Sequence, residues 1–573
     1  MLYLVQKRRR RYLELAALVP TFEGRLPIVG HMYKLIGGSE RFWENAKQAT
    51  IAAEKAGGVL AIWAGPNVVF LINDPEDAMT ALNTCLEKSY IYKMGSSWVG
   101  DGLITADVPT WKRHRKLLNP TFSQHVLDGF LAIFNRQAAL LAQDLEAEAG
   151  RGPFDPTDYL TERTLESVCR KLQLLLRGRS LPTKPTPAFP TIFSANILPG
   201  RPPGIPGIPG IPPGHPHLRE EETAVGISLD DRSVIDTKYK KAVETAFDVL
   251  AQRLASFWLH PDFIYRFTAM KQKEDIAMAT LHNMSRSVLH KRRKERQEAR
   301  LANTSSRRFI AFLDLLLDLA EDGSFTDDQI QQELDTLIAA GHDTSSRALI
   351  STLVLVGTHL DVQKKIYEEI LAVLGSSADL CKEDMAKLVY TEAVIKEVLR
   401  ISPVTPIIAR DIDKELKLSK LMMILGMIFY LLWVIKYTLP ALRGALRMGA
   451  LGTSPVCPYG KDENYTLPAG SGCIVSLWGI HRLPIWGPDR MEFKPERWLD
   501  PSKLPQNPGC YGAFSLGRRN CIGKNYALMS VKTNLVHLVR KFHITADYSK
   551  VKRKYDLLLK YVEGHHIALE LRN

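Results

Sequence analysis

The chain has 573 residues, of which 45% are hydrophobic and 24% charged, so it is neither disordered, collagen-like nor a multi-span membrane protein. Its 75 Lys and Arg residues against 62 Asp and Glu give a formal net charge of +13, which favours acidic partners. The seven cysteines include no C-x-x-C pair, so the sequence indicates neither a disulfide scaffold nor a zinc cluster and favours a reducing compartment.

The N-terminus joins five apolar residues, 1–5, to a basic run over residues 7–11. Five residues cannot cross a bilayer, which requires about 20. The pattern is that of the last turn of a membrane anchor followed by its cationic cytoplasmic flank. We interpret residues 1–19 as a truncated anchor and basic flank; a basic terminus without an anchoring role is the alternative.

Two internal segments differ from their surroundings. Residues 184–217 contain the run G-I-P-G-I-P-G-I-P-P, which cannot form helix or sheet ladders because proline lacks the N–H donor. Residues 421–439 carry one charge, Lys436, and are a transmembrane candidate on hydropathy alone.

The rest of the chain predicts an α+β protein that is mainly α. The sequence T-D-D-Q at 326–329 is a capping box, and apolar residues follow it at helical spacing. A second amphipathic helix is predicted over 384–400, ended by two prolines, and strands are predicted over 59–72 and 473–477.

The strongest motif is F-S-L-G-R-R-N-C-I-G at 514–523, directly before a helical pattern over 524–538. It fits F-x-x-G-x-R-x-C-x-G at all five fixed positions, which are Phe514, Gly517, Arg519, Cys521 and Gly523. A helix N-terminus lowers the pKa of a cysteine and holds its thiolate. Such a thiolate is an axial ligand that favours O–O cleavage on haem iron. The alternative is a buried structural cysteine in a glycine-rich turn.

This loop and four further motifs, which stand along the chain in the family's order, resemble the cytochrome P-450 superfamily of haem-thiolate monooxygenases. The four are W-K-R-H-R at 111–115, A-G-H-D-T at 340–344, E-V-L-R at 397–400 and F-K-P-E-R-W at 493–498. The resemblance implies the cytochrome P-450 fold, with a large helical domain and a smaller β-rich domain over residues 20–573.

The resemblance also implies a role for each matched residue. It implies haem b with Cys521 as the metal ligand, oxygen activation by Thr344 and Asp343, and a structural triad of Glu397, Arg400 and Arg497. The other cofactor-binding positions that it implies are Trp111, Arg115, Arg519 and Arg410 at the haem propionates, and Phe514, Gly517 and Gly523 around the sulfur.

Shorter patches, at 258–264, 312–316, 341–344 and 514–527, resemble the animal microsomal family that contains fatty-acid ω-hydroxylases. Many members carry a glutamate immediately before the helix glycine, where it can esterify haem, whereas this chain has Ala340. We therefore expect no covalent haem attachment there, and a fatty-acid ω-preference does not carry over directly.

The resemblance spans the chain except for residues 170–221 and 420–462, which we interpret as insertions of intervening sequence left in a gene model. Residues 414–418 and 465–469 should then pair as one β-hairpin. The alternative for the second segment is a membrane-inserted loop at 421–439.

We expect an endoplasmic reticulum enzyme with a cytoplasmic catalytic domain that hydroxylates a lipophilic substrate such as a fatty acid, hydrocarbon, hormone or xenobiotic. The implied partners are O₂, the membrane surface, an NADPH-dependent flavoprotein reductase and cytochrome b5. Four basic residues suit an acidic reductase: Lys112, Arg113, Lys116 and Arg518.

No nucleic acid is expected, because the basic stretch 290–308 has little aromatic interleaving. The alternatives are a haem-thiolate isomerase that needs no electrons and an inactive, haem-less remnant disrupted by the insertions.

Overall fold

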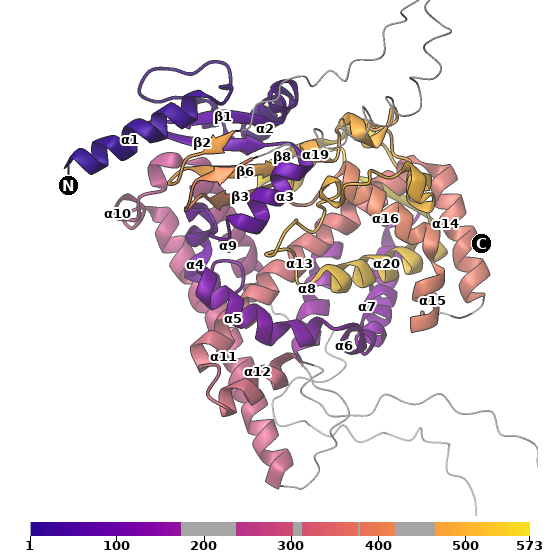
Figure 1. Ribbon diagram of the computed structural model, residues 1–573. Coiled ribbons are helices and arrows are strands. Elements are labelled where there is room, and N and C mark those ends of the chain that lie inside the picture. Colours follow the sequence, from indigo (N-terminus) through magenta and orange to yellow (C-terminus); the bar gives the residue numbers. More distant parts are fainter. Residues whose placement is uncertain are drawn as a thin grey trace, which may run out of the picture.

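A computed structural model describes residues 2–173, 237–301, 312–375, 377, 379–418 and 465–572 (Figure 1). The segment 420–462, with its transmembrane candidate at 421–439, lies outside the described residues, as does 170–221 apart from its first four residues. Every helix within the described ranges is too short or too polar to cross a membrane.

Helices dominate the described chain. The α-helices are α1 (Leu2–Ala17), α2 (Gly38–Lys55), α3 (Pro75–Thr84), α4 (Ser96–Val99), α5 (Val108–Leu118), α6 (Gln124–Asp128), α7 (Leu131–Asp144), α8 (Thr157–Gln173), α9 (Thr237–Ala255), α10 (Asp262–Tyr265), α11 (Ala269–Leu301), α12 (Phe312–Glu321), α13 (Asp327–Thr358), α14 (Leu360–Leu374), α15 (Lys382–Lys387), α16 (Val389–Ile401), α19 (Leu477–Ile480) and α20 (Lys524–Lys541). The strands are β1 (Val59–Ala64), β2 (Asn67–Ile72), β3 (Ile407–Asp411), β4 (Leu416–Lys417), β5 (Thr466–Leu467), β6 (Gly472–Ser476), β7 (Phe542–Ala546), β8 (Lys552–Asp556), β9 (Leu558–Glu563) and β10 (Ile567–Leu571).

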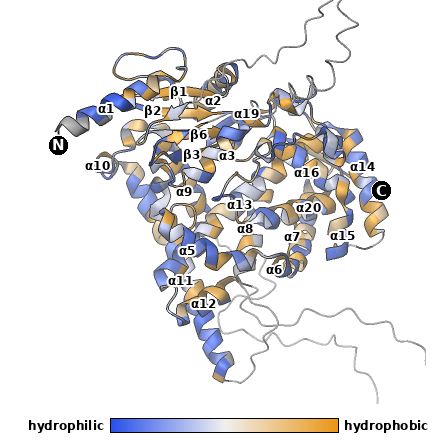
Figure 2. Cartoon of the chain, in the orientation of Figure 1, coloured by the Kyte–Doolittle hydropathy of each residue, from blue (hydrophilic) through white to orange (hydrophobic). Residues whose placement is uncertain are grey.

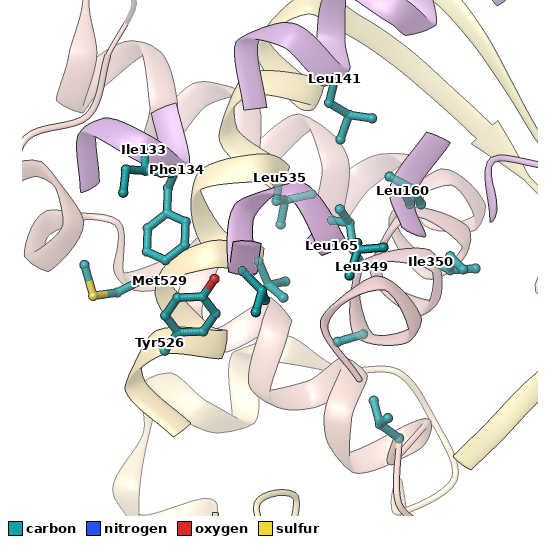
Figure 3. Packing of buried hydrophobic residues seen from close by; sticks show 14 of the residues in the cluster. Ile133, Phe134, Leu141, Leu160, Leu165, Leu349, Ile350, Tyr526, Met529 and Leu535 are labelled. Carbon is teal, nitrogen blue, oxygen red and sulfur yellow. The ribbon is translucent and has the colours of Figure 1, made fainter. Parts of the chain in front are cut away.

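The helical core forms around α13, which packs against α8 and α20 while α7 packs on both of those helices. Figure 3 shows Phe134 and Tyr526 side by side in this core, with ring centroids 5.0 Å apart. The predicted capping box starts α13: the Gln329 N–H donates to the Thr326 hydroxyl and the Thr326 N–H donates to the Gln329 side chain. Figures 1 and 2 place α13 in the middle of the molecule, and most of its residues after Thr344 are buried.

The β-rich part contains a four-stranded sheet in the order β1-β2-β6-β3. β1 and β2 form an antiparallel hairpin over the predicted 59–72 region, and β6 contains the predicted 473–477 strand except for Leu477, which begins α19. Helix α1 packs on this part of the molecule, because Tyr12 and Ala16 are buried in the same cluster as the sheet. The Tyr12 hydroxyl accepts a 2.8 Å hydrogen bond from the Val68 N–H. The second half of α1 is therefore docked on the β-rich part.

The predicted helix over 384–400 is wrong in one respect, because the structure divides it into α15 and α16 at Leu388. Leu388 has non-helical dihedral angles, φ −78° and ψ 68°. The carboxylate of Glu369, on α14, accepts hydrogen bonds from the N–H groups of Tyr390 and Thr391. A carboxylate distant in sequence thus caps α16, which local periodicity cannot reveal.

A buried carboxylate links α11 to α13. Asp335 on α13 accepts a hydrogen bond from the Ser285 hydroxyl of α11, and His282 of α11 lies 3.7 Å from its other oxygen. Burial raises the pKa of Asp335 to about 7, although hydrogen bonds from Ser285 and Gln331 and the charge of Arg286 oppose the rise. The folded state therefore favours the neutral acid at this position.

Candidate functional site

The cysteine loop folds back on itself before α20. The Cys521 N–H donates to the Phe514 carbonyl oxygen at 2.9 Å, and Gly523 is the N-cap residue of α20. Gly517 has φ +69°, and a Cβ there would lie 2.6 Å from the Leu82 carbonyl oxygen. Only glycine fits this turn without strain.

Cys521 exposes its sulfur to an internal cavity. Burial raises the pKa of its thiol, and the Gly523 N–H and the charges of Arg115 and Lys524 only partly offset this. The expectation that the helix N-terminus lowers the pKa of this cysteine is therefore wrong for the protein alone. An apolar surrounding outweighs the helix end, and a bound metal charge is what deprotonates a coordinating thiol.

The cavity has a volume of about 1370 Å³ and reaches from the cysteine loop to α13. Ala340, Gly341 and Thr344 of α13 line it, as do Phe514 and Cys521 of the loop. Most of its other lining residues are apolar, among them Met94, Trp98, Phe247, Leu337, Val404 and Ile408. The size and lining suit a large, mainly apolar guest beside the sulfur.

The two predicted oxygen-activating residues differ in their position relative to the cavity. Thr344 lines the cavity, and its hydroxyl donates to the Ala340 carbonyl oxygen at 2.7 Å. Asp343 is buried outside the cavity lining, where Arg347 donates to its Oδ1 at 3.1 Å and its Oδ2 has no hydrogen-bond partner among the described residues. Burial opposes ionisation of Asp343, but the charges of Arg347, His342 and Lys560 outweigh it and lower the pKa of its carboxyl.

Gly341 lines the cavity and also lies where two helices approach each other closely. A Cβ at this position would lie 3.0 Å from a methyl carbon of Val168, on α8. The glycine therefore permits the close approach of α8 to α13.

Four of the residues predicted at the haem propionates gather at one side of the cavity. Trp111 and Arg115, one helical turn apart on α5, both line it, as do Arg410 of β3 and Arg519 of the cysteine loop. The Arg519 guanidinium lies 4.9 Å from the centroid of the Trp111 ring. Arg115 donates to the carbonyl and the side chain of Asn520, which couples α5 to the cysteine loop.

Lys88 joins this cluster and was missed by the sequence reasoning. It lines the cavity and forms a β-bridge with Arg410. Burial, together with the charges of Arg410 and Arg519, lowers the pKa of Lys88 well below its ordinary value. No local motif marks this lysine, because its place depends on the bridge to a strand more than 300 residues away.

These residues fit the haem that the resemblance implies. The Nε atoms of Arg410 and Arg519 are buried without a hydrogen-bond partner among the described residues. Arg519 donates to the carbonyls of Leu86, Leu103 and Ala106 and Arg410 to that of Ala409, but neither has a carboxylate partner among the described residues. Buried cations without a counter-charge are costly, so an anionic group would stabilise this cluster. The two propionates of a haem would supply that charge, and Cys521, which lines the same cavity, would supply the metal ligand.

The predicted triad forms a closed network behind the cysteine loop. Arg400 donates to both carboxylate oxygens of Glu397, at 2.9 and 2.8 Å, and Arg497 donates to Oε1 at 3.0 Å. The Trp498 ring N–H and the Lys494 backbone N–H also donate to this carboxylate. All three triad side chains are buried. None of them lines the cavity, which suits a structural role.

A buried hydrogen-bonded contact, also unmarked by the sequence, joins α5 to α13. His114 Nδ1 lies 2.7 Å from Glu333 Oε1, and both side chains are fully buried. Burial raises the pKa of Glu333, while His114 and the Leu103 N–H lower it. Because His114 is next to Arg115, this contact fixes the helix that carries the propionate-side residues.

Comparisons with known proteins agree with this geometry. The chain matches the sequence model of the family Cytochrome P450 over residues 20–172, 221–433 and 461–565. It is 26% identical to "Cytochrome P450 4V2" of Mus musculus over 97% of this chain and 90% of that protein. It is 27% identical to "Cytochrome P450 4c21" of Blattella germanica (90% and 86%) and 28% identical to "Probable cytochrome P450 4s3" of Drosophila melanogaster (86% and 81%).

Proposed function

Because the chain belongs to the cytochrome P450 family of haem-thiolate monooxygenases, we propose that it hydroxylates a lipophilic substrate with O₂ and electrons from NADPH. An NADPH-dependent flavoprotein reductase delivers the electrons, with cytochrome b5 as a second donor. The observation that carries the proposal is the apolar cavity of about 1370 Å³ that holds the Cys521 sulfur and Thr344. Its apolar lining favours a fatty acid, hydrocarbon, hormone or xenobiotic over a polar substrate.

Bound haem with a thiolate ligand supplies electron density for O–O cleavage. Cys521 holds the iron, and Lys88, Trp111, Arg115, Arg410 and Arg519 hold the propionate side. Thr344 presents a hydroxyl to the cavity; turning away from the Ala340 carbonyl would free it to donate a proton to a guest. The proposal also gives a role to Asp343, the neighbour of Thr344 in the sequence, which is buried next to Arg347 and would link the hydroxyl to the proton supply.

The face of the protein that binds the electron donor is proposed from its exposed basic residues. Lys112, Arg113, Lys116 and Arg518 are all exposed, and α5 and the cysteine loop, which carry them, both border the cations of the cavity. A cationic face beside the metal ligand suits the acidic surface of a reductase. Changing all four to glutamine should lower the rate of reductase-dependent turnover without changing the reduced carbon-monoxide spectrum.

Association with the endoplasmic reticulum membrane has support from exposed apolar residues. Trp258, Phe263 and Phe267, around α10, expose 51%, 65% and 85% of their side chains. Large exposed aromatic residues on one short segment are typical of a membrane or protein contact. We assign this segment to the cytoplasmic face of the membrane.

The two unusual segments are proposed to be insertions. β4 and β5 pair antiparallel, and the Leu418 N–H donates to the Tyr465 carbonyl oxygen at 2.9 Å. The residues that flank 419–464 are therefore already hydrogen-bonded to each other. The family match omits 173–220, which is nearly the whole first segment, and 434–460 of the second, while it includes 420–433. Sequencing the transcript across both junctions tests this: their presence in mature message would overturn it.

The deciding experiment is the carbon-monoxide difference spectrum of the reduced protein, on the full chain and on the chain without 170–221 and 420–462. A strongly red-shifted thiolate band that Cys521→Ser abolishes is expected. NADPH-dependent substrate oxidation, lost when the reductase is omitted, separates the monooxygenase from an isomerase. Absence of haem in both forms of the protein would support the inactive remnant instead. Because Ala340 offers no carboxylate, acidified solvent should extract the haem intact.

A further inference from the structure

Glu274, on α11, brings a buried carboxylate to the cavity. It lines the cavity, and only 6% of the residue is exposed. The Ser97 hydroxyl of α4 donates to its Oε1 at 2.6 Å, and Lys271 Nζ lies 3.2 Å from its Oε2. Each carboxylate oxygen can accept more than one hydrogen bond, so a further donor can bind here. A wholly apolar substrate would exclude water from this carboxylate and offer it no donor, which is costly.

A buried donor without a partner follows Ser97 on α4. Trp98 is 5% exposed and lines the cavity. Its indole N–H has no hydrogen-bond partner among the described residues. Phe247 packs against the indole in an edge-to-face arrangement, with ring centroids 5.2 Å apart, which restricts the ring. An acceptor on a bound molecule would remove the cost of leaving this N–H unpaired.

Helix α4 stands well away from the reacting end of the cavity. The Thr336 hydroxyl of α13 donates to the carbonyl oxygen of Val99, the last residue of α4, at 3.5 Å. Thr336 precedes Thr344 by eight residues. At about 1.5 Å of rise per residue, the two levels are about 12 Å apart along the axis of α13. Leu337 and Gly341 line the cavity between them.

We propose that Glu274 and Trp98 form a subsite for the hydroxyl group of a lipophilic alcohol, whose reacting carbon lies about 12 Å away, beside Thr344. The inference rests on the proposed function and narrows its substrate class. A hydroxyl donates to Glu274 and accepts from the Trp98 N–H, so it satisfies both groups. A protonated amine has no acceptor. An ionised fatty acid has no donor, and Glu274 repels it.

The test compares three probes with a twelve-carbon chain, 1-dodecanol, 1-methoxydodecane and dodecanoate, on the haem-loaded full chain. Equilibrium dialysis with quantification by mass spectrometry gives each Kd. We expect 1-dodecanol to bind about tenfold more tightly than the ether, which cannot donate to Glu274, and than dodecanoate. Its NADPH-dependent oxidation should fall at the end of the chain remote from the hydroxyl.

Variants separate recognition from a structural role of the carboxylate. Glu274→Met should weaken 1-dodecanol binding about tenfold and tighten dodecanoate binding, a reciprocal change that general damage to the cavity cannot produce. Glu274→Gln keeps the shape of the side chain and should also tighten dodecanoate binding. Trp98→Phe should weaken the alcohol and the ether alike, about three- to tenfold, because both oxygens accept from the N–H. The matched control is Glu298→Met on α11, because the Glu298 side chain is 63% exposed and should leave all three Kd values unchanged.

The proposal is overturned if the unmodified protein binds the ether or dodecanoate as tightly as 1-dodecanol, a result that requires no variant to fold. It is also overturned if Glu274→Met weakens all three probes equally, or if Trp98→Phe leaves alcohol binding unchanged. Failure of the proposed function looks different: the preference for 1-dodecanol persists, but no NADPH-dependent product forms.

Discussion

The buried triad makes a sharp prediction about Glu397→Gln. Glutamine has the same shape as glutamate but carries no charge, and one carboxylate oxygen becomes an amide N–H₂ donor. With the amide oxygen in the Oε1 position, it keeps its bonds from Arg400, Arg497 and the Lys494 N–H. The amide nitrogen then faces two donors, Arg400 Nε and Trp498 Nε1, both of which lose their acceptor.

The expected cost follows from these contacts. Two hydrogen bonds to a charged group at about 1.5–3 kcal/mol each give about 3–6 kcal/mol. Removing the charge of one partner from a buried ion pair costs about 3–5 kcal/mol, because the other charges stay buried. Arg400 is completely buried, and Arg497 keeps only Asp489 as a counter-charge. We therefore expect the free energy of unfolding to fall by about 4 kcal/mol, a large part of the 5–15 kcal/mol typical of a folded protein.

Urea unfolding followed by circular dichroism and by haem absorbance measures this change; where refolding is incomplete, the unfolding rate replaces the midpoint. The matched control is Glu368→Gln on α14, because the Glu368 side chain is 60% exposed and its partner Lys364 lies 3.8 Å away. An exposed pair of this kind contributes about 0–1 kcal/mol. If Glu397→Gln costs no more than this control, the triad does not stabilise the fold as argued.

Three further predictions test separate parts of the structure. Because the folded pKa of Asp335, about 7, lies above its unfolded value, the native state binds the extra proton between about pH 4 and 7. The free energy of unfolding should therefore fall as pH rises through that window, by at most about 1.4 kcal/mol per unit, and Asp335→Asn should remove this slope in urea titrations. Phe263→Ser with Phe267→Ser should reduce co-sedimentation with phospholipid vesicles several-fold, because both rings are largely exposed. Gly517→Ala should cost about 1–3 kcal/mol beyond its backbone strain and reduce the haem content, because the added Cβ meets the Leu82 carbonyl.

Each of these has a matched control. Gly470 has φ +86° but open space around it, so Gly470→Ala isolates backbone strain from the clash, and equal losses in the two glycine variants would contradict the steric argument. Leu301→Ser removes an 82% exposed apolar residue at the far end of α11 and should leave vesicle binding unchanged. For Asp335, a slope that persists in the asparagine variant would assign the pH dependence to another group.

The parts of the site that the sequence predicts are those encoded by local motifs. The capping box of α13, the cysteine loop before α20 and the E-x-x-R pair on α16 all join residues within ten positions, so short-range geometry determines them. The division at Leu388 was missed for the opposite reason, because its cap comes from Glu369 on another helix. Residues outside the described ranges contribute nothing to this comparison.

The charge balance of the cavity shows why its remaining members need the fold. Lys88 and the His114–Glu333 contact each join segments at least 219 residues apart. The separations between these paired residues follow neither helix nor strand periodicity, so the sequence alone does not reveal the contacts. The lowered pKa of Lys88 beside two arginines reports a surplus of positive charge, which a bound anion would offset. The pKa of Cys521 supports the same conclusion. The loop positions the sulfur, but burial raises the pKa of its thiol, and the charge of a bound metal would deprotonate it. The cations and a Cys521 thiolate are thus each unfavourable alone in an apolar cavity, and one metal cofactor with anionic groups would stabilise both.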